Sequence, residues 1–251
     1  MNRLLPALAS LGLLLPLSGC GGSDQDPTTT LTVYAAASLT ATFEQLADEF
    51  EHDHPGTDVQ LSFGGSSDLV TQIQEGAAAD VFASADLATM QKLTDDDLAD
   101  GDPQDFATNT LEIAVPPGNP AGITGLQDLA KPGVNLVVCA PEVPCGAATG
   151  AVADAAGVTL TPVSEEQSVT DVLAKVTSGE ADAGLVYRTD VQAAGKDVEG
   201  IEFPEADSVV NTYPIAVVQG SGETDLAHEF VDLVLGDAGR RALADAGFGP
   251  P

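Results

Sequence analysis

The feature that most constrains the fold is an apolar segment that leads directly into a helix pattern. Residues 31–34 alternate between apolar and more polar side chains and include β-branched residues, which is typical of a strand. Apolar residues then recur at helical spacing as far as Phe50. Three alanines and Ser38 lie between the two patterns. Ser38 is therefore predicted to lie where a strand ends and a helix begins.

The same order of strand pattern and helix pattern recurs along the chain. Further strands are predicted at residues 58–63, 79–86, 111–115, 135–139, 181–187 and 213–218. Helices are predicted at residues 90–98, 126–130, 146–156, 168–177, 226–235 and 240–246, and another begins after residues 64–68. This alternation favours an α/β fold, and 251 residues are enough for one large domain or two lobes.

The position of Ser38 at a helix start suggests an anion site. The first backbone N–H groups of a helix have no partner within the helix, and the helix dipole adds about half a positive charge there. A small anion can therefore be held without lysine or arginine. The alternative is that Ser38 is an ordinary N-cap residue.

Two segments of the chain share one pattern, which suggests two similar halves. Ser66 and Val169 each begin a helix pattern, and each lies ten residues before a glycine, Gly76 and Gly179 respectively. An Ala-Asp pair and an apolar strand follow both glycines. Two lobes of similar build would each present a helix N-terminus, although any two αβ units share some of this pattern.

The charge balance excludes one class of partner. Eight Lys and Arg residues stand against 39 Asp and Glu residues, which gives a net charge of −31 spread along the chain. Such a surface repels nucleic acid and weakens the steering of any anion, so an anion site must rely on local dipoles. Solubility at high ionic strength is an alternative explanation of the charge.

The N-terminus has the pattern of an export signal. A basic residue precedes an apolar run, and residues 17–20 resemble the lipobox of bacterial lipoproteins, in which Cys20 would be lipidated. We therefore predict a signal peptide at residues 1–19 and a flexible tether at residues 20–30. An ordinary secretory signal with a chance cysteine is the alternative. The protein is expected to be extracytoplasmic and anchored to the cell membrane.

The two remaining cysteines, Cys139 and Cys145, frame a short loop. In an exported chain they are expected to form a disulfide. A redox site is the alternative, but the spacing is not Cys-x-x-Cys.

Catalytic motifs are poorly represented. His52 and His54 lie beside a proline at a predicted helix end, where a surface turn is favoured over a metal site. Residues 64–67 could hold a phosphate group through backbone N–H groups, but no lysine follows, so a bare tetrahedral anion fits better. Tyr187 ends an apolar strand, where it could donate to such an anion or be a core tyrosine.

Several segments together resemble the substrate-binding proteins of bacterial molybdate ABC transporters. They are residues 33–40, 62–69, 72–77, 79–86, 141–146, 184–187, 213–218 and 247–248. The resemblance covers residues 31–248 in unbroken order. It implies a two-lobed periplasmic-binding-protein fold of type II, with a mixed sheet flanked by helices in each lobe and the ligand in the cleft between them. Residues 31–109 with 213–251 would form lobe I, and residues 110–212 would form lobe II.

The resemblance also implies a ligand set and a partner. Hydroxyl groups of Ser38, Ser66 and Tyr187 and backbone N–H groups of Cys145 and Val169 would hold molybdate or tungstate. Cys145 departs from the alanine that is common in the family at that loop position. Molybdenum would be present only as the bound oxyanion, with no cofactor. The protein would be a monomer that serves a membrane permease.

Other functions remain open from the residues alone. A receptor for sulfate or another oxyanion is the nearest alternative, and the acidic surface also allows a cation such as iron or a polyamine. Iron would require clustered tyrosines or histidines, and the three tyrosines are scattered. An exported hydrolase with Ser38 or Ser66 as nucleophile lacks a suitably placed histidine. The sequence therefore favours a binding protein over an enzyme.

Overall fold

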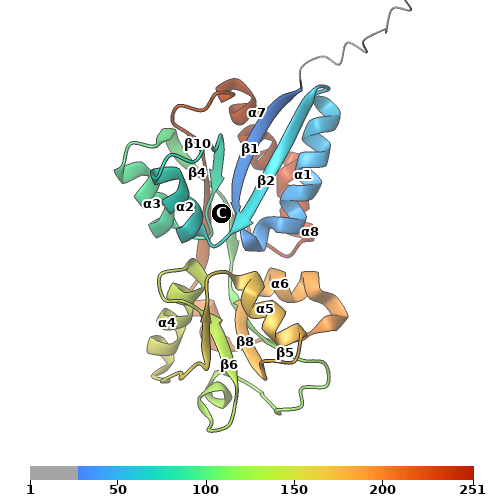
Figure 1. Ribbon diagram of the computed structural model, residues 1–251. Coiled ribbons are helices and arrows are strands. Elements are labelled where there is room, and N and C mark those ends of the chain that lie inside the picture. The colour runs from blue at the N-terminus through green and yellow to red at the C-terminus, as the bar shows by residue number, and fades with distance from the viewer. Residues whose placement is uncertain (1–27) are drawn as a thin grey trace, which may run out of the picture.

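The computed structural model describes residues 28–251, which form two lobes joined by two chain segments (Figure 1). The predicted signal peptide, the lipidation site at Cys20 and most of the predicted tether lie outside the described residues. Among the described residues, no helix has both the length and the apolar character needed to cross a membrane.

Lobe I, the upper lobe in Figure 1, is built on a five-stranded mixed sheet. Its strands, in spatial order, are β2 (Thr57–Gly64), β1 (Thr29–Ala36), β3 (Val81–Ala83), β10 (Asn211–Val218) and β4 (Ala99–Asn109). The first three are parallel, and β10 runs antiparallel to both of its neighbours. The helices of this lobe are α1 (Thr40–Asp53), α2 (Ser66–Gln74), α3 (Leu87–Asp95), α7 (Thr224–Leu235) and α8 (Asp237–Asp245).

Lobe II repeats this plan with a second mixed sheet. Its strands, in spatial order, are β7 (Ser164–Glu166), β6 (Leu136–Cys139), β8 (Ala183–Tyr187), β5 (Leu111–Val115) and β9 (Glu199–Ile201). Its helices are α4 (Pro144–Ala156), α5 (Val169–Thr177) and α6 (Arg188–Ala194). Short 3₁₀ helices complete the two lobes: η1 (Ala37–Leu39), η2 (Leu126–Ala130), η3 (Gly195–Asp197) and η4 (Pro204–Ser208).

The chain passes between the lobes at two adjacent points. The first crossing follows Asn109 at the end of β4, and the second precedes Asn211 at the start of β10. These two asparagines are register partners in the antiparallel pair of β4 and β10. The two crossings therefore lie side by side, and we call Asn109 and Asn211 the hinge asparagines.

Each lobe has its own apolar core, and the two cores differ in character. In lobe I the ring of Phe43 lies 6.0 Å from those of Phe106 and Phe230, and all three are buried. The core of lobe II consists mainly of valine, leucine and alanine from both faces of the second sheet. Truncating a buried phenylalanine such as Phe43 to alanine typically costs about 3–5 kcal/mol.

The sequence does not predict every element. The sequence pattern does not predict strand β4, because the first seven residues of this strand are polar or half-exposed and include Pro103. It is an edge strand, and edge strands need only one apolar face and tolerate proline. Helix α6 and the short strands β7 and β9 are also absent from the sequence-based assignment, because their patterns are too short to show a period.

Candidate functional site

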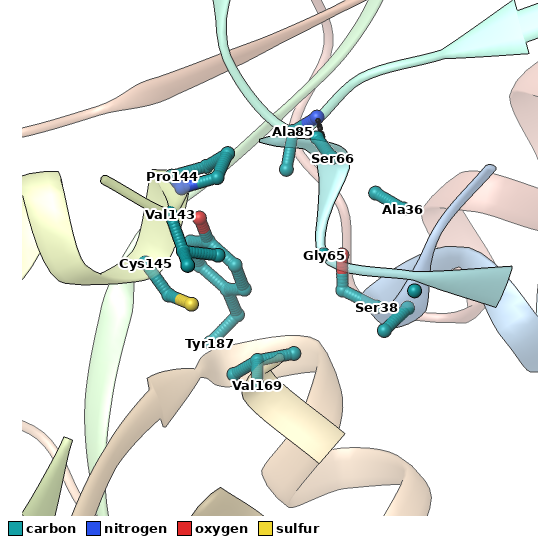
Figure 2. Close-up of a pocket in the computed structure, with 12 residues that line it drawn as sticks. Ala36, Ser38, Gly65, Ser66, Ala85, Val143, Pro144, Cys145, Val169 and Tyr187 are labelled. Atoms are coloured by element: carbon teal, nitrogen blue, oxygen red, sulfur yellow. Dashed lines mark hydrogen bonds between the residues drawn. The ribbon is translucent and has the colours of Figure 1, made fainter. Parts of the chain in front are cut away.

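A small cavity lies between the two lobes, with a volume of only about 10 Å³ available to the centre of a water molecule (Figure 2). It is lined by Ala36, Ala37, Ser38, Gly64, Gly65, Ser66, Ala85, Val143, Pro144, Cys145, Val169 and Tyr187. Pockets for drug-sized ligands are usually larger, at about 300–1,000 Å³. The cavity therefore suits a small ion better than a nucleotide or a peptide.

The structure brings together all five residues that the sequence proposes as ligands. Ser38, Ser66, Cys145, Val169 and Tyr187 line the same cavity, although they come from both lobes. Four of them lie in the first turn of a helix, since Ser38 is in η1 and the others begin α2, α4 and α5. First-turn N–H groups have no partner within their own helix. The cavity thus collects positive helix ends from both lobes.

Ser38 is not an N-cap residue. The capping position of η1 is occupied by Ala36 and that of α1 by Leu39. The N-cap alternative is therefore wrong, because the strand passes into a short 3₁₀ turn before α1 starts. Ser38 lies within this turn, and its Oγ is 3.0 Å from the Tyr213 hydroxyl.

Ser66 has one hydrogen-bond role filled by the protein and one left for a ligand. The backbone N–H of Ala85 donates to Ser66 Oγ at 3.0 Å, and the Ser66 residue is almost fully buried. A hydroxyl group carries one proton and two lone pairs. Because the N–H occupies a lone pair, the hydroxyl proton of Ser66 is available to an anion in the cavity.

Tyr187 has the same arrangement. The side-chain amide of Asn211 donates to the Tyr187 hydroxyl oxygen at 3.1 Å. Burial raises the pKa of the Tyr187 phenol well above its ordinary value, and the neighbouring Tyr213 adds to the shift. The phenol therefore keeps its proton at neutral pH, and that proton can be donated to a ligand.

Tyr213 is a buried neighbour of the site that the sequence does not identify. Its hydroxyl pairs with Ser38 Oγ, its ring packs against that of Tyr187 with centroids 6.0 Å apart, and burial raises the pKa of its phenol. If Tyr213 donates to Ser38, the Ser38 proton is free for an anion. Only its place in a buried strand marks Tyr213 in the sequence, and that pattern is typical of a core residue.

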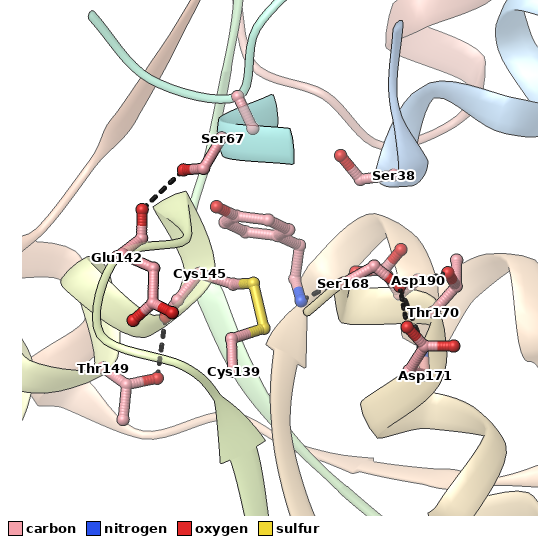
Figure 3. The surroundings of a disulfide bond; sticks show 12 residues. Ser38, Ser67, Cys139, Glu142, Cys145, Thr149, Ser168, Thr170, Asp171 and Asp190 are labelled. Carbon is pink, nitrogen blue, oxygen red and sulfur yellow. Dashed lines mark hydrogen bonds between the residues drawn. A yellow bond between two sulfur atoms is a disulfide. The ribbon is translucent and has the colours of Figure 1, made fainter. Parts of the chain in front are cut away.

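The two lobes touch each other at the mouth of the cavity. Ser67 Oγ in lobe I donates to the backbone carbonyl of Glu142 in lobe II at 2.5 Å (Figure 3). A Cβ atom built on Gly65 would lie only 2.1 Å from the carbonyl oxygen of Gln167 in lobe II. The absence of a side chain at Gly65 thus permits this approach, and the structure represents a closed cleft.

A disulfide joins Cys139 at the end of β6 to Cys145 in the first turn of α4 (Figure 3). Its Cα atoms are 5.7 Å apart, and both residues are buried. The pair that the sequence predicts is therefore present. Because Cys145 lines the cavity, the disulfide ties the helix end that faces the ligand space to the lobe II sheet.

Removing this disulfide is expected to weaken both folding and binding. For the double variant Cys139→Ala and Cys145→Ala, the loop-entropy model gives a loss of about 2–3 kcal/mol in unfolding free energy. Anion affinity should fall about 3–10-fold, because the first turn of α4 becomes less constrained. Thermal unfolding with and without ligand measures both effects. An unchanged affinity would show that the disulfide serves stability alone.

In the part of the chain that the structure describes, no cationic, histidine or carboxylate side chain lines the cavity. His54 pairs with Glu229 at 2.7 Å and His228 with Asp100 at 3.5 Å, both on the surface of lobe I. Within residues 28–251, no three His, Cys, Asp or Glu side chains are grouped as a metal site would require. The cavity therefore offers neutral hydrogen-bond donors and no evident general base.

One buried carboxyl group lies just behind the cavity. Asp190 accepts a hydrogen bond from the backbone N–H of Tyr187 at 2.9 Å, and burial raises its pKa from 3.8 to about 7. The folded protein thus binds a proton that the unfolded chain releases between these two values. Asp190 therefore contributes fully to the stability of the folded protein below pH 3.8, and this contribution is lost as the pH rises through about 7.

Asp190→Asn should remove this pH dependence, since an amide oxygen can still accept from the Tyr187 N–H. The variant is expected to be more stable than the original protein at pH 8 by about 2–4 kcal/mol and nearly equal to it at pH 4. Urea unfolding at both pH values measures the difference. A stability gap of the same size at both pH values would contradict this assignment.

The chain is similar to known proteins over almost its whole length. Residues 31–249 match the family described as bacterial extracellular solute-binding protein. The molybdate-binding protein ModA of Mycobacterium tuberculosis H37Rv is 47% identical over 248 residues, covering 99% of this chain and 95% of that protein. ModA of Escherichia coli K12 is 33% identical, covering 87% of this chain and 88% of that protein.

A solved structure gives the same result at the level of the fold. The periplasmic molybdate-binding protein of Azotobacter vinelandii matches with a TM-score of 0.76 at 27% sequence identity, covering 88% of this chain and 99% of that chain. The predicted two-lobed α/β fold, with a mixed sheet in each lobe, is thereby confirmed.

Proposed function

Because this chain belongs to the family of bacterial extracellular solute-binding proteins, we propose that it captures molybdate and delivers it to the permease of an ABC transporter. The ligand is bound without chemical change, and no cofactor takes part. The observation that carries the proposal is the closed cavity between the lobes, which is lined by neutral donors and by helix N-termini.

The proposed ligand set is Ser38, Ser66, Cys145, Val169 and Tyr187. Three hydroxyl groups and the first-turn N–H groups would each direct a hydrogen to an oxygen of the dianion. Hydrogen bonds to a charged group contribute about 1.5–3 kcal/mol each, so several of them can hold a dianion without a counter-charge. The lobes that close over it are residues 31–109 with 213–251, and residues 110–212.

Selection among tetrahedral dianions would depend on the size of the cavity. Tungstate closely resembles molybdate in size and charge, and we propose that it binds as well. Sulfate is smaller, so in a closed cleft some donors would be stretched or left unpaired. A buried donor without a partner is costly, and this cost would favour the larger anions.

The location of the protein is part of the proposal. The family acts outside the cytoplasm, and the pattern of residues 17–20 supports lipidation of Cys20 after removal of residues 1–19. Residues 20–30 would then connect the anchor to lobe I and allow a monomer to move near its permease. Mass spectrometry of the mature protein purified from membranes tests this, since an unmodified N-terminus would contradict it.

The function is tested by titrating the purified protein with molybdate, tungstate and sulfate in calorimetry. Molybdate and tungstate should bind at least about 100-fold more tightly than sulfate, which corresponds to one or two impaired charge-assisted hydrogen bonds. Each tight ligand should also raise the melting temperature. Equal binding of all three anions would favour a general oxyanion receptor, and binding of none would refute the proposal.

A further inference from the structure

Asn211 occupies a special position at the second chain crossing. It is the first residue of β10, it is only 7% exposed, and it faces its register partner Asn109. Its side-chain nitrogen donates to the carbonyl oxygen of Ala85 at 3.0 Å and to the hydroxyl oxygen of Tyr187 at 3.1 Å. One side chain at the hinge is thus bonded to both lobes.

The chemistry of these two partners fixes the direction of both hydrogen bonds. A backbone carbonyl can only accept, so the nitrogen of the Asn211 amide must face Ala85. An amide nitrogen carries two hydrogens and accepts none, so the second hydrogen goes to the Tyr187 oxygen. Tyr187 must therefore accept from Asn211 and direct its own proton elsewhere, which leaves that proton for the cavity that Tyr187 lines.

Ala85 connects the same amide to Ser66, the hydroxyl that lobe I presents to the cavity. While its carbonyl accepts from Asn211, its N–H donates to Ser66 Oγ at 3.0 Å. The two hydroxyl groups that face the anion space from opposite lobes are thus both oriented from the hinge side. Each uses a lone pair on a protein donor and keeps its proton for the ligand.

We infer that Asn211 is a positioning residue for oxyanion binding: it never touches the anion, but its amide holds the Tyr187 hydroxyl in the orientation that donates to it. This inference rests on the function proposed above. Aspartate has the same shape but no hydrogen to donate, and it would instead accept the Tyr187 proton. A neutral double donor is therefore required at this position.

A double-mutant cycle for molybdate affinity tests the inference. Asn211→Ala should weaken binding about 10-fold in the original protein, as expected for a hydrogen bond that acts on a charged ligand. In the Tyr187→Phe background the same change should cost less than about 3-fold, because the hydroxyl group through which it acts is gone. Additive losses in the two backgrounds would overturn the inference.

Asn109→Ala is the matched control for disturbance of the hinge. It removes an equally buried amide from the facing strand, and that amide donates to Thr189 Oγ1 at 2.8 Å and to the Tyr213 hydroxyl at 3.5 Å, but not to Tyr187. Its effect should be the same with and without the Tyr187 hydroxyl. If Asn109→Ala depends on Tyr187 as strongly as Asn211→Ala does, the effect belongs to the hinge as a whole and the inference is wrong.

Asn211→Leu covers the case in which the alanine variant is unstable. It approximately preserves the size of the side chain, has no hydrogen to donate and adds no charge near the dianion, so it should reduce molybdate affinity as alanine does, with the same dependence on Tyr187. Failure of the original protein to bind molybdate would refute the proposed function. The original protein could instead bind molybdate tightly and be weakened by Tyr187→Phe, while the Asn211→Ala loss is the same in both backgrounds. That result would refute this inference and leave the proposed function intact.

Discussion

Replacing Gly65 with alanine is expected to lower molybdate affinity about 100-fold or more, because donors from one lobe are lost at about 1.5–3 kcal/mol each. The added Cβ would lie 2.1 Å from the Gln167 carbonyl oxygen in the opposite lobe, which is an overlap of atoms. The Cβ atom is bonded to the backbone and the carbonyl oxygen is part of it, so neither atom can move away by rotation of a side chain. The lobes would have to stay apart, and the two sets of donors could not reach one anion together.

The unliganded protein should be unaffected by this change. The backbone at Gly65 has φ of −63° and ψ of 130°, a conformation that any residue adopts. Gly150→Ala is the matched control, because its Cβ would meet no heavy atom within 4 Å and the residue lies outside the cavity lining. Calorimetry gives the affinities, and small-angle X-ray scattering reports whether molybdate compacts each variant. A Gly65→Ala protein that binds as tightly as the original would contradict the closed geometry described above.

Tyr187→Phe is expected to reduce molybdate affinity about 10–100-fold, since it removes one charge-assisted hydrogen bond and leaves the Asn211 amide with one partner fewer. The phenylalanine ring fills the same space, so the packing against Tyr213 is retained. The melting temperature without ligand should fall by a few degrees, because the buried Asn211 N–H loses its partner. The rise in melting temperature that molybdate causes should shrink in proportion to the lost affinity.

Tyr34→Phe provides the control for loss of a phenol hydroxyl. Tyr34 lies on β1 and is half-buried against the apolar cluster of Leu69, Phe82 and Met90 in lobe I, outside the cavity lining. Its removal should leave molybdate affinity within about 2-fold, because surface hydroxyl changes usually have small effects. Equal losses in the two tyrosine variants would show that Tyr187 has no special role in the ligand set.

The sequence predicts the site residues better than it predicts their supports. Ser66 and Val169 follow from a shared pattern of residues before a glycine, and the structure brings both to the cavity. That pattern is local, and local patterns are readable because helix starts and strands have short periods. Ser38 and Tyr187 follow from their places at a helix start and a strand end, and the resemblance to molybdate-binding proteins adds Cys145 and joins the five residues into one proposed ligand set.

The supports of the site are not local, and for this reason the sequence does not reveal them. Ser38 and Tyr213 are separated by 175 positions, and Asn211 and Ala85 by 126. Nothing near Asn211 in the sequence indicates which hydroxyl it will meet. The polar edge strand β4 is missed for a related reason, since the strand that it pairs with is β10, about a hundred residues later.

The absence of any lysine or arginine from the cavity lining has a consequence for unloading. In the proposed ligand set the anion is held only by hydrogen-bond donors from the two lobes, so binding lasts as long as the lobes stay closed. Opening the two lobes would be enough to release the anion, so the same hinge movement would serve for both binding and release.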